Sequence, residues 1–585
     1  MMKKSSVQMI TKAVALAAAV MFGNTALAAD YYWDNDAAAG FGTAGGTWTA
    51  PTLNLWSLDS TGDAAREASI TTTTNDALHF GTASAGLAAG TITVSGTVSA
   101  NSLTFGSASG AITLSGGTSL TLGGTSPTIT LNNSQDTITF PIAGTGGLTK
   151  AGTGQLRLSG NNTYSGATTI SAGNLTLFQI GRLGGGSYSG NIIISGNFQY
   201  YSWVDQTLSG NISGTGEVRK VAYDSDLTLS GANTYSGATT ISAGRLAINN
   251  AGALSPNTAV TVSTNETSSG QLYFQTNTKS NTFNNAMTLS GLGFIEDDNT
   301  QIGAIRFEDG VTLGGTLTLT NDARVGILGT KSGTISGQVT GPGGLEFHGV
   351  KNSNNQNCTL TLSNTANDYA GTTTISSKDY STTARTGCTT TLKLGAAGVI
   401  PDGAGKGIVA LIGTNANHLT LLDLNGFNET VNGLTNSAAE GARITNTGAG
   451  TAILTVGAGD TNSAFSGVIT EAGSGALLAL SKIGAGTLTL SATNSYTGAT
   501  SVSGGTLKLT HANVLASTTA VEITNGAKIN LDFSGINTVR SLTVDGKLRQ
   551  RYTVYTAAKL PGALSGTGAL YTLEGAPKGT LMLFR

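Results

Sequence analysis

Short runs of alternating apolar and polar residues fill most of this sequence. From about residue 91, apolar side chains alternate with Thr or Ser, as in 91–94 (TITV), 102–105 (SLTF), 111–114 (AITL) and 119–122 (SLTL). An alternation of period two is typical of a strand with one buried face. Clusters of Gly or Asn separate the runs, and these residues tolerate the backbone angles of tight turns. The pattern therefore predicts many short strands joined by turns.

A repeated frame decides how these strands are arranged. The stretch 227–244 (LTLSGANTYSGATTISAG) closely matches 156–173, and 488–509 keeps the same spacing. In each copy an aliphatic residue returns 19 positions later: Leu158 to Leu177, Leu229 to Ile248, and Leu490 to Leu509. Many short strands also fit a sandwich or a barrel. Three strands in about 20 residues, however, match one coil of a solenoid.

The expected fold is therefore an all-β, right-handed parallel β-helix. We expect about 20 coils of roughly 20 residues, with a cap at each end, because a solenoid must cover its terminal strand edges. The expected regions are a signal peptide at 1–28, an N-terminal cap at 29–90, the helix at 91–544 with clear repeats at 146–177, 227–248, 360–394 and 480–509, and a C-terminal cap at 545–585.

Both ends of the sequence differ from the repeats. Residues 1–28 contain a basic start, an apolar core and Ala26-Leu27-Ala28, which predicts a secretory signal cleaved after Ala28. The apolar core is shorter than the roughly 20 residues that span a bilayer, and we expect no membrane span in the mature chain. Three of the four tryptophans lie in 30–70. We interpret them as part of the cap; the alternative is a small aromatic surface that binds carbohydrate.

Composition and charge narrow the range of partners. The chain is 39% hydrophobic and only 11% charged, so it does not resemble a disordered protein. It has 30 Lys and Arg against 32 Asp and Glu. Removal of the three lysines of the signal leaves a more acidic mature chain, which argues against nucleic acid as a partner.

The stretch 146–177 (GGLTKAGTGQLRLSGNNTYSGATTISAGNLTL) and the stretch 480–509 carry a recognisable motif. They resemble the autotransporter-associated β-strand repeat, also called the passenger-associated transport repeat, and 422–434 (LDLNGFNETVNGL) resembles another segment of such proteins. The resemblance implies an exported β-helix that is displayed on the cell surface or released. The sequence after the last repeat lacks the strands of a translocator barrel. We therefore expect a separate outer-membrane translocator, another secretion route, or a periplasmic location.

Residues that could carry chemistry fall into two groups. Asp423, Asp532, Lys150 and Lys482 recur with the repeats, and recurrence favours a structural role. The residues that occur only once are Glu296, Asp297, Asp298, Glu308, His348 and His418. No nucleotide-binding, metal-binding or zinc-protease motif is present in the sequence, so we expect no catalytic, cofactor or metal site. The alternative is a secreted β-helix enzyme that degrades polysaccharide, which would need a unique charged cluster on one face of adjacent coils.

The two cysteines, Cys358 and Cys388, favour a disulfide in an exported chain. By the repeat frame Leu362 and Leu394 lie on neighbouring coils, although 32 residues separate them instead of 19. A bridge would tie an inserted loop to the coil below, and in the chain-entropy model it would contribute about 3 kcal/mol. The alternative is two unpaired, buried thiols.

Each repeat also places a tyrosine at the same turn: Tyr164, Tyr235, Tyr369 and Tyr496. A row of exposed tyrosines could stack on sugars, but many coils separate these four, so we expect them to pack over coil corners. The predicted function is a secreted or surface-displayed, non-enzymatic protein with a structural, adhesive or matrix-contact role. Its expected partners are a surface glycan or matrix.

Overall fold

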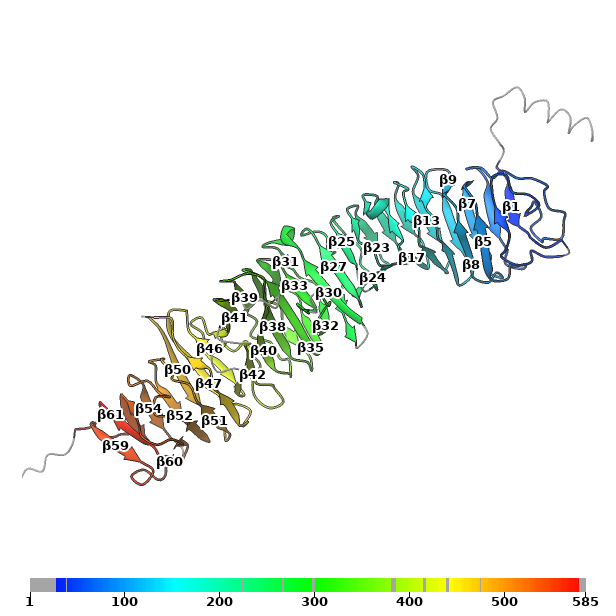
Figure 1. The fold of residues 1–585 in the computed structure, drawn as a ribbon. Coiled ribbons are helices and arrows are strands. Elements are labelled where there is room, and N and C mark those ends of the chain that lie inside the picture. The colour runs from blue at the N-terminus through cyan, green and yellow to red at the C-terminus, as the bar shows by residue number, and fades with distance from the viewer. Residues whose placement is uncertain are drawn as a thin grey trace, which may run out of the picture. The chain divides into compact units, whose positions relative to one another are not determined.

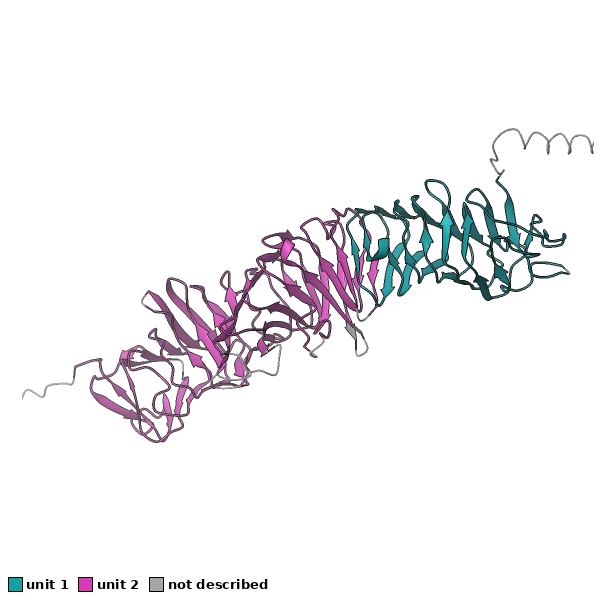
Figure 2. Cartoon of the chain, turned by 45° about the horizontal axis from the view of Figure 1, so that its top comes forward, with its two compact units in different colours: residues 1–216 teal, residues 217–585 magenta. Residues whose placement is uncertain are grey.

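A computed structural model describes residues 28–577, apart from 38, 223–224, 266–267, 297–299, 380–385, 414–416, 438–440, 474 and 525. The chain divides into two compact units, residues 1–216 and 217–585 (Figure 2). Each unit is built from short strands that stack in parallel on their equivalents in the next coil (Figure 1). The chain forms a parallel β-solenoid of about 19 turns, which confirms the predicted all-β fold.

Unit 1 has three main sheets that run along the coils, beside a small parallel sheet of β15 (Asn161–Asn162) and β18 (Arg182–Leu183). In the first sheet β1 and β3 are antiparallel and the later pairs are parallel. Its strands are β1 (Asp30–Trp33), β3 (Trp56–Ser57), β4 (Ala77–Phe80), β7 (Ser102–Phe105), β10 (Thr128–Leu131), β13 (Leu148–Ala151), β16 (Thr168–Ile170), β20 (Ile192–Ile194) and β23 (Ile212–Gly214).

The other two main sheets of unit 1 are parallel throughout. The second contains β2 (Thr47–Trp48), β5 (Gly90–Val94), β8 (Ile112–Gly116), β11 (Gln135–Ile138), β14 (Gln155–Leu158), β17 (Asn174–Gln179) and β21 (Asn197–Ser202). The third contains β6 (Thr97–Ala100), β9 (Ser119–Leu122) and β12 (Ile142–Ala143).

Unit 2 continues the same architecture with longer strands. One of its sheets carries most of the charged residues discussed below. It contains β25 (Asp226–Leu229), β27 (Gly244–Ile248), β30 (Ser268–Phe274), β33 (Ile305–Phe307), β35 (Leu317–Leu328), β38 (Leu345–Lys351), β40 (Thr373–Asp379), β42 (Val409–Ile412) and β45 (Leu434–Asn436).

A second sheet of unit 2 carries both cysteines, and a third and a fourth complete its later coils. The second contains β31 (Thr282–Phe283), β34 (Val311–Leu313), β36 (Ser332–Ile335), β39 (Asn357–Leu362), β41 (Cys388–Leu394), β43 (His418–Asp423), β46 (Ala442–Thr445) and β49 (Val468–Ile469). The third contains β44 (Glu429–Val431), β47 (Gly450–Val456), β50 (Ala476–Lys482), β52 (Thr500–Val502), β54 (Ala520–Ile523), β57 (Ser541–Val544) and β58 (Lys547–Leu548). The fourth contains β48 (Ser463–Phe465), β51 (Thr487–Leu490), β53 (Thr506–Leu509), β55 (Lys528–Leu531) and β60 (Leu564–Gly566).

The 19-residue frame is confirmed as the register of stacked strands. Leu158 pairs with Leu177, Leu229 with Ile248, and Leu490 with Leu509. These six side chains are at most 1% exposed. The aliphatic residue of each alternating run therefore points into the coil, where it stacks on its equivalent and is removed from water.

The N-terminal aromatic residues form a compact cluster at the first coils. Trp33, Trp48 and Trp56 are all 0% exposed, and the rings of Trp33 and Trp56 meet edge to face at 4.9 Å. Buried indoles offer no stacking surface to a sugar, which counts against the carbohydrate-binding alternative. Strand β4 already pairs in parallel with β7, so the first coil begins before residue 91.

The solenoid also continues past residue 544. Strand β60 pairs in parallel with β55, and β61 (Ala569–Thr572) pairs in parallel with β56 (Ile536–Val539). Two antiparallel pairings then end the described part, β58 with β57 and β59 (Thr553–Thr556) with β61. Antiparallel strands at both ends interrupt the parallel stacking that an open edge would otherwise offer to another chain.

Candidate functional site: buried repeat residues and a charged face

The motif lysine of two repeats, at 146–177 and 480–509, is buried and holds together two coils. Lys150 is 0% exposed, and its ammonium group donates to the carbonyl oxygens of Ala151 (2.9 Å), Gly152 (2.7 Å) and Ala172 (3.1 Å). Lys482 repeats this arrangement with Gly484 (3.0 Å) and Gly504 (3.2 Å). An ammonium group has three donors, and three carbonyl acceptors satisfy it. Burial lowers the pKa of Lys150 to about 8, and the carboxylate of Asp136 opposes that shift.

The tyrosine of each repeat is buried as well. The hydroxyl groups of Tyr235 and Thr239 lie 2.7 Å apart, those of Tyr369 and Thr373 2.6 Å, and those of Tyr496 and Thr500 2.7 Å. All four repeat tyrosines are at most 2% exposed. The expectation that they pack at coil corners is confirmed, and they cannot present a sugar-stacking row.

A buried asparagine that recurs with the repeats was not predicted. Asn162 accepts from the backbone N–H of Ile142 (3.0 Å) and donates to the carbonyl oxygen of Arg182 (3.1 Å), so that it joins three successive coils. Asn494 does the same with Ile469 and Val514. The sequence does hold a signal for these residues, because each lies two positions before a repeat tyrosine.

A network of charges covers part of the outer face of unit 2. Arg245 pairs with Asp226 (2.7 Å) and with Glu296 (2.9 Å). Arg306 contacts Glu296 (3.2 Å) and Glu308 (3.4 Å), and Lys331 pairs with Glu308. The structure thus brings together two of the predicted residues, Glu296 and Glu308, on a shared guanidinium group. Asp297 and Asp298 lie outside the described residues.

These two carboxylates are poorly suited to acid–base chemistry. Glu296 is 8% exposed and Glu308 5%, and the phenol of Tyr273 donates to Glu308 at 2.6 Å. General acid–base catalysis in glycoside hydrolysis needs two carboxyl groups on either side of an open cleft. Here arginine, lysine and tyrosine occupy the carboxylate oxygens, which indicates an ion-pair network.

His348 lies beside this network in a hollow of about 680 Å³, which Arg324, Glu346, Ser376 and Lys378 also line. The Ser376 hydroxyl lies 2.6 Å from Nδ1 of His348 and 2.5 Å from a carboxylate oxygen of Glu346. Arg324 holds that carboxylate with two hydrogen bonds, of 2.9 and 3.0 Å. In a serine hydrolase the imidazole lies between the serine hydroxyl and the carboxylate. Here the Ser376 hydroxyl lies between the other two groups, so the order of a catalytic triad is not reproduced.

The electrostatics of this hollow oppose such a role. Burial and the positive charges of Arg324, Lys378 and Lys351 hold the pKa of His348 well below its ordinary value. A general base must accept the proton of the nucleophile, and this imidazole resists protonation. In the described part of the chain its Nε2 also has no hydrogen-bond partner to stabilise the charged ring. The cluster therefore does not favour the enzyme alternative.

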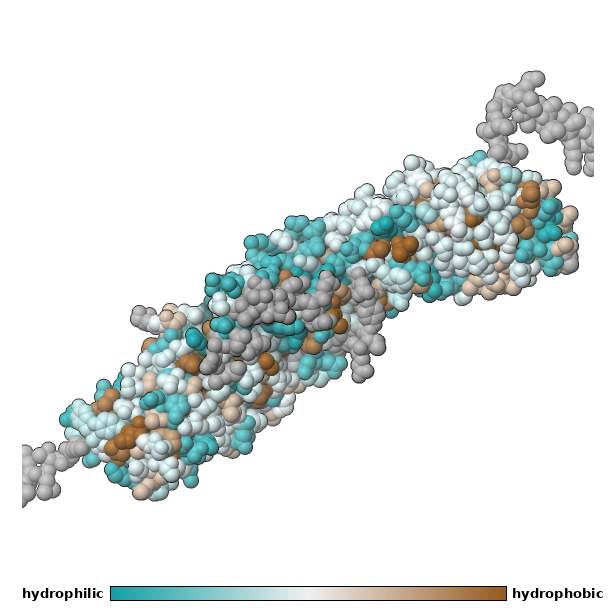
Figure 3. Space-filling model, viewed as in Figure 1, coloured by the Kyte–Doolittle hydropathy of each residue, from teal (hydrophilic) through white to brown (hydrophobic). Residues whose placement is uncertain are grey.

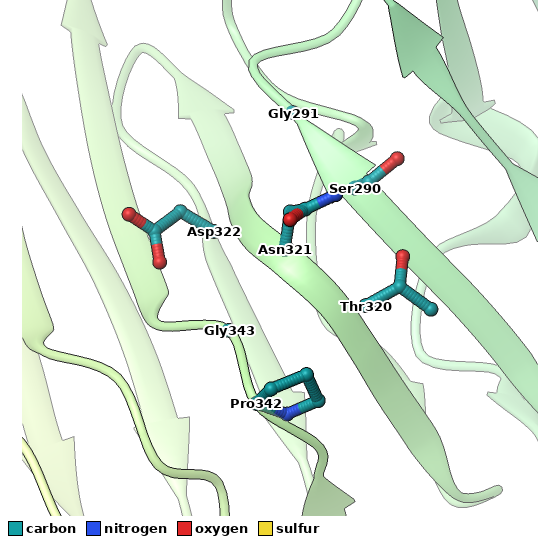
Figure 4. A pocket seen from close by; sticks show the side chains of 7 residues that line it. All are labelled: Ser290, Gly291, Thr320, Asn321, Asp322, Pro342 and Gly343. Atoms are coloured by element: carbon teal, nitrogen blue, oxygen red, sulfur yellow. The ribbon is translucent and has the colours of Figure 1, made fainter.

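A second hollow, of about 370 Å³, carries little chemistry. Its lining consists of Ser290, Gly291, Thr320, Asn321, Asp322, Pro342 and Gly343 (Figure 4). The single carboxylate among these, Asp322, accepts from the backbone N–H of Gly344 at 2.7 Å. No cluster of three or more metal-ligating side chains occurs among the residues that the structure describes.

The remaining predicted residues have local roles. Asp423 accepts from the backbone N–H groups of Asn425 (2.9 Å) and Thr447 (3.0 Å), and Asp532 pairs with Lys508 at 2.7 Å. His418 is 0% exposed and lies opposite Cys388 on the next coil. These positions agree with structural roles. Ala28 is the first described residue, and the cleavage after it stays a prediction.

The two cysteines are both 0% exposed, and no disulfide joins them in this structure. Leu362 and Leu394 pair as predicted, but Cys358 lies opposite Thr390, two residues beyond Cys388. A two-residue offset on adjacent parallel strands separates the Cα atoms by about 8 Å. A disulfide reaches only about 7 Å. The Cys358–Cys388 disulfide therefore stays a prediction, and it requires a backbone shift from this register.

Comparison with known proteins agrees with the motifs. A family description, the passenger-associated-transport-repeat, matches residues 148–177, 224–248, 359–377 and 480–509. The adhesin BmaC autotransporter of Brucella suis biovar 1 is 38% identical over 174 residues, which are 30% of this chain and 5% of that protein. The chain thus spans a small fraction of the length of this relative. No solved structure matches. Four segments of this chain therefore match the passenger-associated transport repeat, and each of them holds one of the buried tyrosines.

Proposed function

We propose that this protein is an exported, surface-displayed β-solenoid passenger with a non-enzymatic, adhesive or matrix-contact role. The observation that carries the proposal is the use of the repeat motif. The lysine, tyrosine and apolar residues of the motif all make contacts that stack the coils on one another. The similar protein is named an adhesin autotransporter. A long stacked solenoid provides an extended surface for contact without a catalytic cleft.

The partners in this proposal are a surface glycan or matrix component and, for export, a separate or linked outer-membrane translocator. Among the described residues no helix has the length and apolar character to cross a membrane. The proposed location is outside the cell or on the outer-membrane surface, and the periplasm is the alternative.

An exposed aromatic group in unit 1 is the surface best suited to such contact. Trp203 is 57% exposed and Ile180 60%, and they follow the stacked rings of Phe178 and Tyr201, whose centroids lie 5.5 Å apart. The guanidinium of Arg157 lies 4.8 Å from the centre of the Phe178 ring. In Figure 3 one of several small hydrophobic areas lies close to the place of β17. Exposed tryptophan is enriched at contact surfaces because one side chain supplies a large apolar area.

Protease treatment of intact cells that express the full chain tests the location. We expect the protein to be cleaved on the cells or found in the medium, whereas a periplasmic marker stays intact. Protection of both proteins would contradict surface display and favour the periplasm. A chain without residues 1–28 is the control, and it should stay protected inside the cell.

Binding of the displaying cells to immobilised glycans and matrix proteins tests the role. We expect Trp203→Ala to weaken attachment several-fold. The matched control is Ile536→Ala, because Ile536 is 48% exposed but lies in unit 2. If cells that display the wild-type protein attach to none of these surfaces, the adhesive role is contradicted. The proposal of surface display would still stand.

A further inference from the structure

A lysine and a cysteine meet inside the solenoid of unit 2. Lys351 ends β38 and Cys358 is the second residue of β39, with the loop 352–356 between the two strands. Both residues are 0% exposed. Nζ of Lys351 lies 2.6 Å from Sγ of Cys358 and donates to the carbonyl oxygen of Thr389 at 2.7 Å.

The residues around Lys351 and Cys358 pack closely against the contact between these two side chains. Gly349 precedes Lys351 on the same face of β38, and a Cβ there would lie 2.0 Å from the Thr390 hydroxyl and 2.9 Å from Sγ of Cys358. Only glycine therefore allows the cysteine and the threonine to fill the position beside Lys351. Cys388 is turned elsewhere, because its Sγ lies 3.6 Å from the carbonyl oxygens of Ser353 and Thr386.

The distance of 2.6 Å between Nζ of Lys351 and Sγ of Cys358 is shorter than a hydrogen bond from nitrogen to sulfur. Even N–H···O bonds have nitrogen–oxygen distances of about 2.9 Å, and sulfur is a larger atom than oxygen. A nitrogen and a sulfur that are both bonded to one small atom between them would lie about this far apart. An exported protein also folds in a compartment where cysteine is oxidised.

We propose that Lys351 and Cys358 form a covalent Nζ–O–Sγ bridge, with molecular oxygen as the oxidant. One N–H bond of the amine and the S–H bond of the thiol break, and an N–O and an O–S bond form. One oxygen atom becomes the bridge, and the other leaves as water with the two hydrogens. The nitrogen and the sulfur each lose two electrons, and dioxygen accepts all four.

The burial of the pair is consistent with this oxidant. Dioxygen is small and apolar and can enter a protein interior, whereas a bulky disulfide reagent cannot reach a thiol that is 0% exposed. The bridge would tie the end of β38 to the start of β39 and so fix one coil beside the insertion between β40 and β41. It does not depend on adhesion, and it requires only that the chain folds in an oxidising compartment.

Mass spectrometry of the mature chain, purified from medium or periplasm without reductant and then denatured, tests the proposal. We expect a chain heavier by one oxygen and lighter by two hydrogens than the reduced form, with one thiol left for alkylation. A chain that is only two hydrogens lighter, with no free thiol, would show the Cys358–Cys388 disulfide and overturn the bridge. Two alkylated thiols on an unmodified chain would overturn it as well.

A tryptic map gives a second readout on the wild-type chain. Trypsin does not cut after a modified lysine, so the bridge leaves the peptide 332–378 uncut at Lys351. Reduction by dithiothreitol in denaturant should restore the cut. Cys388→Ser should keep the mass shift, and Cys358→Ser and Lys351→Met should remove it. Loss of the shift in Cys388→Ser would contradict the assignment to Cys358.

Discussion

The ammonium group of Lys150 lies 3.1 Å from the carbonyl oxygen of Ala172, one coil further along the chain. The same group also holds the carbonyl oxygens of Ala151 and Gly152 in its own coil. One side chain thus satisfies a turn of one coil and fastens the next coil to it. The repeat motif places its lysine where this double contact is made.

Replacement of Lys150 by methionine should loosen the two coils that it joins. Methionine fills the same space but leaves three buried carbonyl oxygens without a donor, and each such group costs about 1–3 kcal/mol. We expect a local loss of stability of about 2–4 kcal/mol. Because a solenoid need not unfold in one step, hydrogen exchange of the amides in 148–177 is the suitable measurement.

The control for this variant is Lys508→Met, which removes a lysine that is one third exposed and pairs with Asp532 at the surface. A surface pair of this kind contributes about 0–1 kcal/mol. Equal exchange in wild type and Lys150→Met would show that the buried lysine does not fasten the coils.

The repeat tyrosines should be sensitive to size more than to the hydroxyl. In Tyr235→Phe the Thr239 hydroxyl keeps its contact with Thr258 at 2.9 Å, so we expect a loss of about 1 kcal/mol. Tyr235→Ala leaves a cavity at a fully buried position and should cost about 3–5 kcal/mol. Protease susceptibility near residue 235 distinguishes the two. A larger effect of the phenylalanine variant would contradict the packing role.

The sequence was sufficient to predict the residues that point into the coil. Leu158 and Leu177 define a frame that the strand register follows, because inward positions recur once per coil with little change in length. The same frame, counted back from Leu362 and Leu394, places Cys388 two residues away from the position opposite Cys358. This offset could have been read from the sequence.

The charged face was harder to predict, because its partners lie one coil apart and the coils vary in length. Asp226 and Arg245 are 19 residues apart, Arg324 and Glu346 22, and Glu296 and Arg245 51. The first two pairs follow from a search for opposite charges one coil apart. The third joins a loop to a distant strand, and no local pattern encodes it.

Glu429 should make the coil around it less stable at high pH. Its carboxyl accepts from the backbone N–H groups of Val399 (3.1 Å) and Ile400 (3.4 Å) and is 1% exposed. Burial raises the pKa of Glu429 from 4.5 to about 8, Asp402 adds to this shift, and the backbone N–H groups oppose it. The folded chain therefore binds a proton that the unfolded chain has released. The stabilisation is complete below about pH 4.5 and is lost as the pH rises through 8.

Hydrogen exchange of the coil that contains Glu429, measured from pH 5 to 9 after correction for the intrinsic rate, tests this prediction. We expect a loss of a few kcal/mol over that range, since one pKa unit corresponds to about 1.4 kcal/mol. Glu429→Gln keeps an acceptor and should remove the pH dependence, whereas the exposed Glu574→Gln should not. A flat profile in the wild type would show that Glu429 is ionised in the fold.

Arg306 should be the most sensitive member of the charged network. It is 8% exposed, contacts Glu296 and Glu308, and its guanidinium lies 4.2 Å from the centre of the Tyr273 ring. Arg306→Met leaves two buried carboxylates with fewer cations, although Arg245 still pairs with Glu296 and Lys331 with Glu308. Removal of one partner from a buried pair costs about 3–5 kcal/mol of stability, and we expect about 2–4 kcal/mol because these cations remain.

Arg219→Met is the control, because Arg219 and Glu217 form an exposed pair at 3.9 Å. Faster proteolysis around Glu296 in Arg306→Met, and unchanged proteolysis in Arg219→Met, would show that the network holds this loop on the sheet. Equal rates in both variants would assign the network no stabilising role.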